Sequence, residues 1–224
     1  MSAATGSRPP RPPRPPRRGR PPTASRDDVL AAAQAQFMAG DRVDLTIVAR
    51  DLGLGRATIY RWFGSRERLL SEVIADESEA LIRRHRRGVR RRGVQGLLEV
   101  FDRINRSLAR SMPLRRFVEQ EGAAALRLLT SSTGAVQTRS VALITDMIDA
   151  EVAAGRYEPP ADAETVAYAI VRLCEAFLYN DAAFGIRGDH ERLREVQAAL
   201  LGVPHAGSAP PKRRRRSTRT PPSG

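Results

Sequence analysis

The chain has 224 residues, 41% of them hydrophobic, so it can bury a sizeable core. Its single cysteine excludes a disulfide framework within one chain, and no stretch reaches the roughly 18 apolar residues that a membrane-spanning helix needs. The net charge is +13, which indicates a polyanionic partner only if the charge belongs to the fold rather than to tails.

Most of the positive charge lies at the two ends of the sequence. Residues 1–26 hold seven Arg, residues 205–224 hold one Lys and five Arg, and neither segment has an acidic residue. The body between them is balanced, with 25 basic and 25 acidic residues over 27–204. Within it, residues 27–92 carry a net +3 and residues 93–204 a net −3. We therefore expect phosphate contacts in the N-terminal third of the fold.

Segments 1–24 and 204–224 are low in complexity and rich in Arg and Pro, so we expect two disordered tails. They are either solvated ends or arms that attract DNA without reading its sequence. The N-terminal segment lacks the apolar region of a secretory signal. Together with the lone cysteine, this predicts a cytoplasmic, nucleoid-associated protein.

Between the tails every segment has helical periodicity, which predicts an all-α fold. The first helix starts at Ser25, with Asp28 as its capping-box partner. A second helix is expected from about Leu45 to Leu52, capped by Asp44, and a third from Arg56 to Phe63. A long fourth helix follows Ser65.

Residues 44–70 have the order of a helix-turn-helix, which lays its second helix in the major groove of DNA. Gly53 permits the positive φ of the turn. Inward-facing apolar residues can close a small core, namely Phe37, Leu45, Val48, Ala49, Leu52, Leu54, Ile59, Phe63 and Leu69. Polar and cationic residues on the outer face can reach base edges and phosphates. The expected DNA contacts are Thr46, Arg56, Ala57, Thr58, Tyr60, Arg61 and Arg66. The alternative is a buried helical hairpin with a solvated Arg face.

Five more helices are expected at about 94–111, 113–130, 135–156, 162–185 and 189–202, the last capped by Asp189. The helix over 162–185 has two apolar stripes, so it needs two partners. Together with the last helix it suits an interface between two protomers. The alternative is a deeply buried helix of a single chain. The residues expected at a dimer interface are Val171, Cys174, Leu178, Leu193, Val196 and Leu200.

The residues of the helix-turn-helix carry a resemblance to a known family. The pattern Thr58-Ile59-Tyr60, Phe63, Ser65-Arg66-Glu67 and Leu69-Leu70 resembles the N-terminal domain of TetR-family regulators. Gly55 stands where that family usually has a Ser or Thr cap, and glycine is a usable cap. The segments VEQEGAAALRLLTSS and AYAIVRLCEAFLYNDAAFGIRGD are similar to the quorum-sensing-degradation regulator (QsdR-like) branch.

The resemblance implies a homodimer on a palindromic operator and a C-terminal domain that binds an unknown small effector, such as a lactone, and then releases the DNA. It divides the chain into a DNA-binding domain over 25–72 and an effector-binding and dimerisation domain over 73–203. Candidate effector contacts are Phe101, Asn105, Phe117, Glu121, Arg127, Met147, Glu175, Tyr179 and Phe184. Among them Glu175 lies in an apolar context and needs a partner, for which Arg172 and the Tyr179 hydroxyl are placed.

The remaining features favour a regulator without a cofactor, metal or catalytic centre. None of the three histidines has metal-ligand spacing, and Cys174 has no base nearby in the sequence. The basic run over 83–92 is either a solvated helix end, an additional phosphate-binding element or part of a signal relay. The competing hypothesis is a sequence-independent nucleic-acid binder or architectural protein that acts through its Arg-rich tails.

Overall fold

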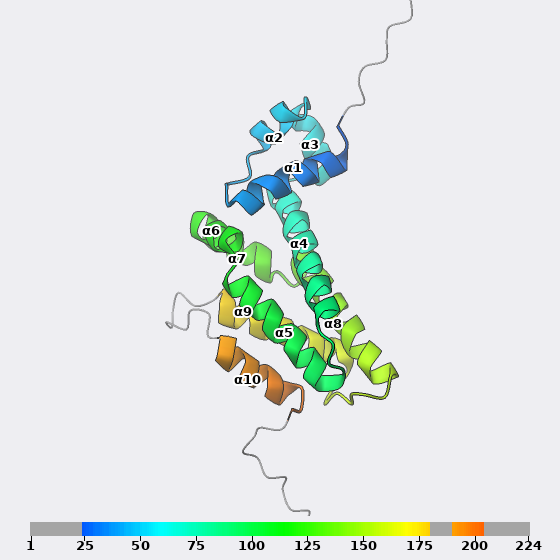
Figure 1. Ribbon diagram of the computed structural model, residues 1–224. Helices are drawn as coiled ribbons and strands as arrows, with labels where there is room; N and C mark the ends of the chain where they lie inside the picture. Colours follow the sequence, from blue (N-terminus) through cyan, green and yellow to red (C-terminus); the bar gives the residue numbers. More distant parts are fainter. Residues whose placement is uncertain (1–23, 180–189, 204–224) are drawn as a thin grey trace, which may run out of the picture.

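The computed structural model describes residues 24–179 and 190–203. In these ranges all regular structure is helical, in agreement with the predicted all-α fold. Figure 1 shows a small helical head (α1–α3) at one end of the long helix α4, and a larger body around its other half. The helices are α1 (Arg26–Ala39), α2 (Leu45–Asp51), α3 (Arg56–Phe63), α4 (Arg66–Gly88), α5 (Gly93–Ala109), α6 (Met112–Glu121), α7 (Ala123–Thr130), α8 (Ala135–Ala153), α9 (Ala163–Leu178) and α10 (His190–Leu200).

Helices α1 and α2 of the head begin where a local side chain satisfies free backbone groups, whereas α3 begins at Gly55 without a side-chain cap. Ser25 and Asp28 form the predicted capping box at the start of α1. The Asp44 side chain accepts from the backbone N–H of Thr46 at the start of α2. Gly53 has a φ of 64°, the left-handed conformation that the turn between α2 and α3 requires. These signals fix the boundaries of the helix-turn-helix locally.

The head encloses the predicted three-helix core. Val48, Ile59 and Leu69 are at most 1% exposed, and Leu52 and Leu54 pack against them half-buried. The same hydrophobic cluster continues into α6 and α7 through Leu114, Phe117, Ala125 and Leu129. The rings of Phe37 and Phe117 meet edge to face, with centroids 5.8 Å apart. The head therefore shares its core with α6 and α7 of the body.

The body is a bundle in which α4 packs along α8, and α8 along α9. Arg139 of α8 binds Asp76 and Glu79 of α4, which adds polar links along the first of these contacts. A second hydrophobic cluster joins the last turns of α4 to α5, α8, α9 and α10. Helix α4 runs without a break across residue 72, the predicted domain border.

The predicted helix over 113–130 is two helices. Gly122 has φ 51° and ψ −122°, which ends α6 and starts α7 in a new direction. A side chain at position 122 would have open space, so the conformation itself requires glycine there.

Some predictions lie outside the described residues. They are the two tails (apart from residue 24), the C-terminal end of the helix expected over 162–185, the effector candidate Phe184 and the cap at Asp189. Within the described ranges, no helix combines the length and apolar character needed to cross a bilayer.

Candidate functional site

Helix α3 turns its apolar side inward and its polar side outward. Ile59 and Phe63 are buried, whereas Arg56, Ala57 and Arg61 are exposed and Thr58 is half-buried. Thr46, on α2, is also exposed. The two buried residues hold the helix by one side against the head, which leaves the opposite side available to a ligand.

Arg56 and Tyr60 lie one turn apart on the outer face of α3. The Arg56 Nη2 atom donates to the Tyr60 hydroxyl at 3.4 Å, and its guanidinium lies 5.8 Å from the centre of the ring. Both line a shallow hollow of about 310 Å³ together with Arg42, Ile47 and Arg66. Arg42 and Ile47 were not among the predicted DNA contacts, although both are exposed beside the start of α2.

Arg66 differs from the other predicted DNA contacts because its guanidinium is bound by groups outside α3, on the segment before α2 and on α6. Its Nε atom donates to the carbonyl of Val43 at 2.8 Å and its Nη2 atom to Glu121 at 2.7 Å. The Arg66 side chain is only 18% exposed. Arg42 also binds the Glu121 carboxylate, at 2.9 Å. These two arginines lower the pKa of Glu121, Arg66 most strongly. In this structure Arg66 therefore joins the head to α6.

Two more contacts tie α6 to the C-terminal end of α1. Arg116 donates to the carbonyl of Ala39 at 3.2 Å, and Gln120 donates to the carbonyl of Gly40 at 3.1 Å. Glu121, predicted as an effector contact, belongs to this junction and does not line the pocket described below.

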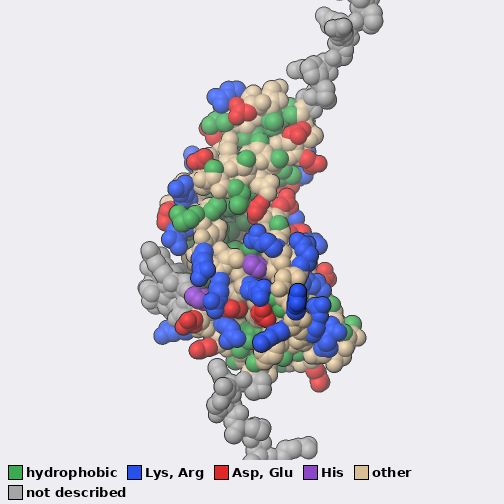
Figure 2. Space-filling model, viewed as in Figure 1, with side chains coloured by type: hydrophobic (Ala, Val, Ile, Leu, Met, Phe, Trp, Pro, Cys, Tyr) green, Lys and Arg blue, Asp and Glu red, His purple; other side chains and the backbone are tan. Residues whose placement is uncertain are grey.

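The charge of the N-terminal third does not lie on the head. Residues 27–82 hold six Arg and ten acidic residues, a net −4, while residues 83–92 hold seven Arg and no acidic residue. The run 83–92 lies in the last turns of α4 and the link to α5, at the end of α4 away from α3. Figure 2 shows basic side chains gathered over the lower half of this face, over α4 and α5. The net charge of +3 over residues 27–92 therefore comes from the run 83–92 and not from the head, so it does not indicate which part of the fold contacts phosphates.

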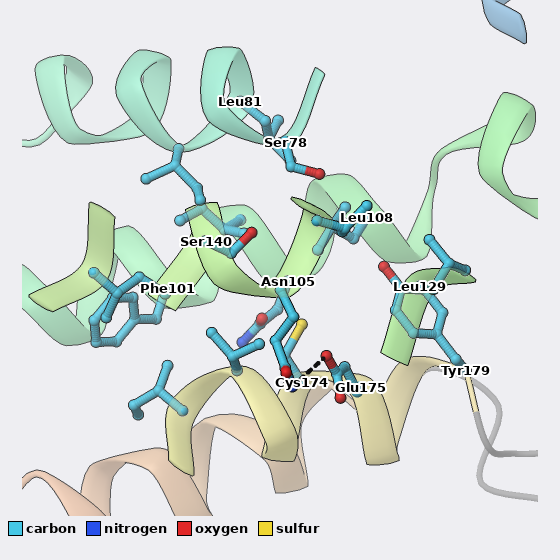
Figure 3. A pocket seen from close by; sticks show the side chains of 17 residues that line it. Ser78, Leu81, Phe101, Asn105, Leu108, Leu129, Ser140, Cys174, Glu175 and Tyr179 are labelled. Carbon is cyan, nitrogen blue, oxygen red and sulfur yellow. Dashed lines mark hydrogen bonds between the residues drawn. The ribbon is translucent and has the colours of Figure 1, made fainter. Parts of the chain in front are cut away.

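A cavity of about 70 Å³ lies between α4, α5, α7, α8 and α9. Four of the predicted effector residues line it, namely Phe101, Asn105, Glu175 and Tyr179. Figure 3 shows Ser78 and Leu81 of α4 on one side and Cys174 and Glu175 of α9 on the other, with the Tyr179 hydroxyl directed toward Leu108. Most of the other lining residues are aliphatic, so a few polar groups face an apolar space.

Glu175 has one of its two predicted partners, Arg172, and a second partner, Gln137, that was not predicted. Arg172 Nη1 donates to its Oε2 atom at 2.7 Å, and Gln137 Nε2 donates to its Oε1 atom at 3.3 Å, the dashed line in Figure 3. Burial raises the pKa of Glu175, and the bonds from Arg172 and Gln137 oppose that rise. Gln137, 2% exposed, was missed because a lone glutamine on a helix has no distinctive sequence signal.

Asn105, Cys174 and Tyr179 also bring polar groups to the lining of the cavity. Asn105 is 2% exposed and donates to Gln197 at 2.8 Å, which joins α5 to α10. Burial raises the pKa of Cys174 to about 12, with a smaller contribution from Glu175. Burial also raises the pKa of Tyr179.

The other described effector candidates lie outside the lining of this cavity. Phe117 belongs to the core shared by the head and α6, and Met147 belongs to the second hydrophobic cluster of the body. Arg127 is exposed on α7.

Three of the predicted dimer residues lie inside one protomer. Leu193 is 0% exposed and Val171 is 8% exposed, so neither is available to a second chain. Val171 and Cys174 line the cavity, which places the stripe they share on the inner side of α9. Val196 is 40% exposed, and Leu178 and Leu200 are half-buried. The outward stripe of α9 instead carries Thr165, Tyr168, Ala169, Arg172 and Ala176.

Within the described residues, no group of three or more His, Cys, Asp or Glu side chains is arranged to hold a metal ion.

Comparison with known proteins gives one family model and several solved structures. Residues 92–202 match the model for the tetracyclin repressor-like, C-terminal domain. The structure is similar to that of the R. erythropolis transcriptional repressor QsdR from the TetR family. The two chains are 28% identical, and the match has a TM-score of 0.76 and covers 82% of this chain and 97% of that one. It is also similar in fold to the TetR family repressor AlkX from Dietzia sp. strain DQ12-45-1b, with 24% identity and a TM-score of 0.58 over 80% and 96%. No protein with a curated description matches the chain.

Proposed function

Because this chain belongs to the TetR family of transcriptional regulators, we propose that it is a dimeric repressor that reads a palindromic operator with α3 and leaves it when a small molecule enters the body. The observation that carries the proposal is the polar face of α3, exposed and braced from behind by buried Ile59 and Phe63. A helix held in this way can enter the major groove as a rigid unit.

The outward side chains of α3 and of the residues beside it fall into two groups: those that can contact base edges and those that can bind phosphate oxygens. Arg56 and Arg61 can each bridge the O6 and N7 atoms of guanine, and Ala57 can contact a thymine methyl group. Tyr60, Thr58 and Thr46 carry hydroxyls that suit phosphate oxygens. Arg42 lies in the same hollow, so we add it to the phosphate anchors. Arg66 serves the head–body junction in this arrangement.

We infer that dimerisation uses the outward stripe of α9. Ala169 and Ala176 are small and let two helices approach closely, while Tyr168 is 45% exposed and lies against Arg172, 5.2 Å from ring centre to guanidinium. An exposed pair of Tyr and Arg is typical of protein interfaces. A two-fold dimer also provides the half-site symmetry of a palindromic operator.

The cavity supports an effector that is mostly apolar and uncharged. Aliphatic side chains form most of its wall, and Glu175, the only carboxylate among the described residues that line it, opposes entry of a second negative charge. The cavity, at about 70 Å³, is smaller than the ~150 Å³ that holds benzene. A larger ligand must therefore push helices apart as it enters, which makes binding and displacement a single event.

The displacement has a direct route to the head. Leu129 of α7 lines the cavity and also belongs to the cluster shared with the head. Helix α7 joins α6 at Gly122, and α6 holds the head through Glu121, Gln120 and Arg116. Movement of α7 therefore acts on the contacts that set the orientation of α3, and a change in that orientation alters the spacing of the two recognition helices.

The test is selection of bound sequences from a pool of random duplexes, followed by affinity measurement on the recovered site. We expect a palindromic consensus, with Arg56→Ala and Tyr60→Ala each weakening its binding while the dimer stays intact. Removing one bidentate interaction with a base costs about 1–3 kcal/mol of discrimination. Arg127→Ala, on α7, is the matched control. Recovery of no consensus, or unchanged binding in both α3 variants, would remove α3 from the DNA.

A truncated chain without residues 1–24 and 205–224 separates the regulator from a binder that acts through its tails. We expect the truncated chain to keep its consensus and to lose part of its salt-dependent affinity. Complete loss of binding would favour the sequence-independent alternative.

A further inference from the structure

The Glu121 carboxylate, at the end of α6, holds two arginines beside the polar face of α3 through one oxygen atom. Its Oε1 atom accepts from Arg42 Nε at 2.9 Å and from Arg66 Nη2 at 2.7 Å. Both arginines line the shallow hollow described above, together with Arg56 and Tyr60 of α3. Guanidinium groups form charge-assisted hydrogen bonds with carboxylate and phosphate oxygens alike. The two arginines are therefore arranged to bind a phosphate, and a carboxylate of the same chain occupies them.

The charge of the hollow depends on this contact. Among the described residues that line it, three are arginines and one, Asp44, is a carboxylate. The Asp44 side chain is engaged in capping α2, where it accepts from the backbone N–H of Thr46 at 2.7 Å. Glu121 brings a second carboxylate to the three arginines, which leaves the group with a net +1. Without the Glu121 charge the net is +2, so opening of this contact favours an anion in the hollow.

The two ion pairs of Glu121 differ in their shielding from solvent. The Arg42 side chain is 70% exposed, so its pair lies open to water and contributes little to stability. The Arg66 side chain is 18% exposed and also donates to the carbonyl of Val43 at 2.8 Å. A phosphate in the hollow therefore gains Arg42 at little cost, whereas it has to compete with Glu121 for Arg66.

We propose that this hollow binds one phosphate of duplex DNA and that Glu121 is its built-in competitor, because the carboxylate and the phosphate use the same two guanidinium groups. The proposal rests on the proposed function in one respect: it takes the polar face of α3 as the surface that meets DNA. Coupling between two sites is reciprocal. A bound duplex therefore weakens the attachment of α6 to the head, and a firm attachment of α6 weakens binding of the duplex.

The competition gives a direction to the signal from the body. Helix α6 ends beside the segment that joins α1 to α2 (Figure 1), where Arg116 and Gln120 also bind. A ligand that presses α6 toward the head strengthens the hold of Glu121 on Arg66 and lowers the affinity for DNA. A ligand that draws α6 away frees both arginines of the hollow for phosphate. Release of DNA by an effector therefore requires the first of these movements.

The experiment measures the affinity of the full-length chain for the selected operator by fluorescence anisotropy. We expect E121Q to bind roughly fivefold more tightly than wild type, near the lower end of couplings between sites. A purely structural carboxylate predicts the opposite sign, since a head that is held less firmly presents α3 less well. E119Q, at an exposed position of the same helix, removes the same charge and should bind like wild type.

A double-mutant cycle connects the gain in affinity to the two arginines. In an R42Q/R66Q background, E121Q should change the affinity by less than about twofold, because the groups for which it competes are gone. A site for one phosphate contributes ~0.9 to the slope of log affinity against log salt, so R42Q/R66Q should lower the slope by about that amount. Thermal melts establish that each variant is folded. If R42Q/R66Q does not fold, R42Q alone completes the cycle, because this side chain is largely exposed.

Every other outcome overturns the competition. Unchanged or weaker binding by E121Q does so, and so does an equal gain in E119Q, which would indicate a general effect of charge. A gain that persists in R42Q/R66Q would separate Glu121 from the hollow, and an unchanged salt slope would remove the phosphate from it. If wild type selects no operator, the proposed function fails. The same cycle on random duplex then still decides the competition, because every duplex carries phosphates.

Discussion

At the scale of single residues, the cavity combines two polar features that act on a ligand differently. Glu175 is the only carboxylate among the described residues that line the cavity, so its charge disfavours an anionic ligand, and its bond with Arg172 offsets part of that charge. Cys174 lies beside it with a pKa raised to about 12, chiefly by burial. Since the chain contains one cysteine, this thiol reports on the cavity without interference from any other site.

We expect native Cys174 to react slowly with a disulfide reagent at pH 8. Burial raises the pKa of this thiol to about 12, so little of it is ionised at this pH, and the reaction rate rises with pH because the thiolate is the nucleophile. A medium-chain γ-lactone should slow labelling further, and the fatty acid of equal chain length should protect less. Labelling as fast as in denaturant would contradict the burial, and equal protection by the fatty acid would contradict an uncharged effector. Cys174→Ser provides the blank.

At the scale of helices, α6 is the element that holds the head. Its last residue, Glu121, accepts hydrogen bonds from Arg42 and Arg66, and Arg116 and Gln120 bind the end of α1. The Glu121 side chain is 11% exposed, so the pair with Arg66 is partly shielded from solvent and more effective than an open surface pair.

We expect Glu121→Gln to destabilise the head–body junction by about 1–2 kcal/mol, because the hydrogen bonds from Arg42 and Arg66 no longer meet a charged acceptor. The folded protein lowers the pKa of Glu121, so its contribution is complete above the ordinary pKa of a glutamate and declines as pH falls through the lowered value. Thermal melts at pH 7 and at decreasing pH should therefore show the two proteins converging in acid. Glu119→Gln, on the exposed side of α6, is the control. A difference that persists undiminished at low pH would exclude the carboxylate as its cause.

Some of the helices could be predicted from the sequence and others could not. Helices α1, α2 and α4 could be predicted because Ser25, Asp44 and Ser65 cap them, and α3 because Gly53 makes the turn before it; all of these are local effects. The break at Gly122 could not, because a glycine within an apolar run is compatible with a continuous helix until tertiary packing decides. The two apolar stripes on α9 indicated that the helix packs against two neighbours. They did not indicate which stripe faces the rest of the same chain and which faces a second protomer.

The site divides in the same way. The polar face of α3 follows from helical periodicity, which reports which side is buried. Gln137 and Ser140 reach the cavity only through the packing of α8, and Arg66 meets Glu121 across 55 positions of sequence. Net charge was misleading, because an excess summed over 27–92 gives no information on which end of α4 carries it.

At the scale of the whole molecule, the helix proposed to read DNA and the concentration of exposed arginines lie at opposite ends of α4. The head (α1–α3, Arg26–Phe63) holds five Arg and five acidic residues, so it has no net charge. It is proposed to read DNA through a few placed side chains, whereas the opposite end of α4 carries a concentration of exposed arginines. The outward stripe of α9 lies on neither end, which leaves it available for the second protomer.

We expect Ala176→Glu to give monomers that bind the operator weakly. Ala176 is exposed in one chain, so a carboxylate there is tolerated by the fold but would be forced against its symmetry mate in a dimer. Light scattering coupled to a sizing column measures the mass. Ala123→Glu, at the first turn of α7, is the control because an acidic residue suits a helix start. An unchanged dimer mass for Ala176→Glu would move the interface elsewhere.

The start of α1 also has a practical consequence for work with this protein. Arg26 lies over the ring of Phe63, 4.5 Å from its centre, and binds Glu72, so the start of α1 lies beside the last turn of α3. If α3 reads the operator as proposed, an affinity tag or fluorophore fused upstream is attached close to the bound DNA, and we expect it to perturb the measured binding constants. A fusion after Val203 is attached at the other end of the molecule, away from α3, where we expect it to leave operator binding unchanged. Labelling each terminus in turn thus offers two independent reporters on one polypeptide.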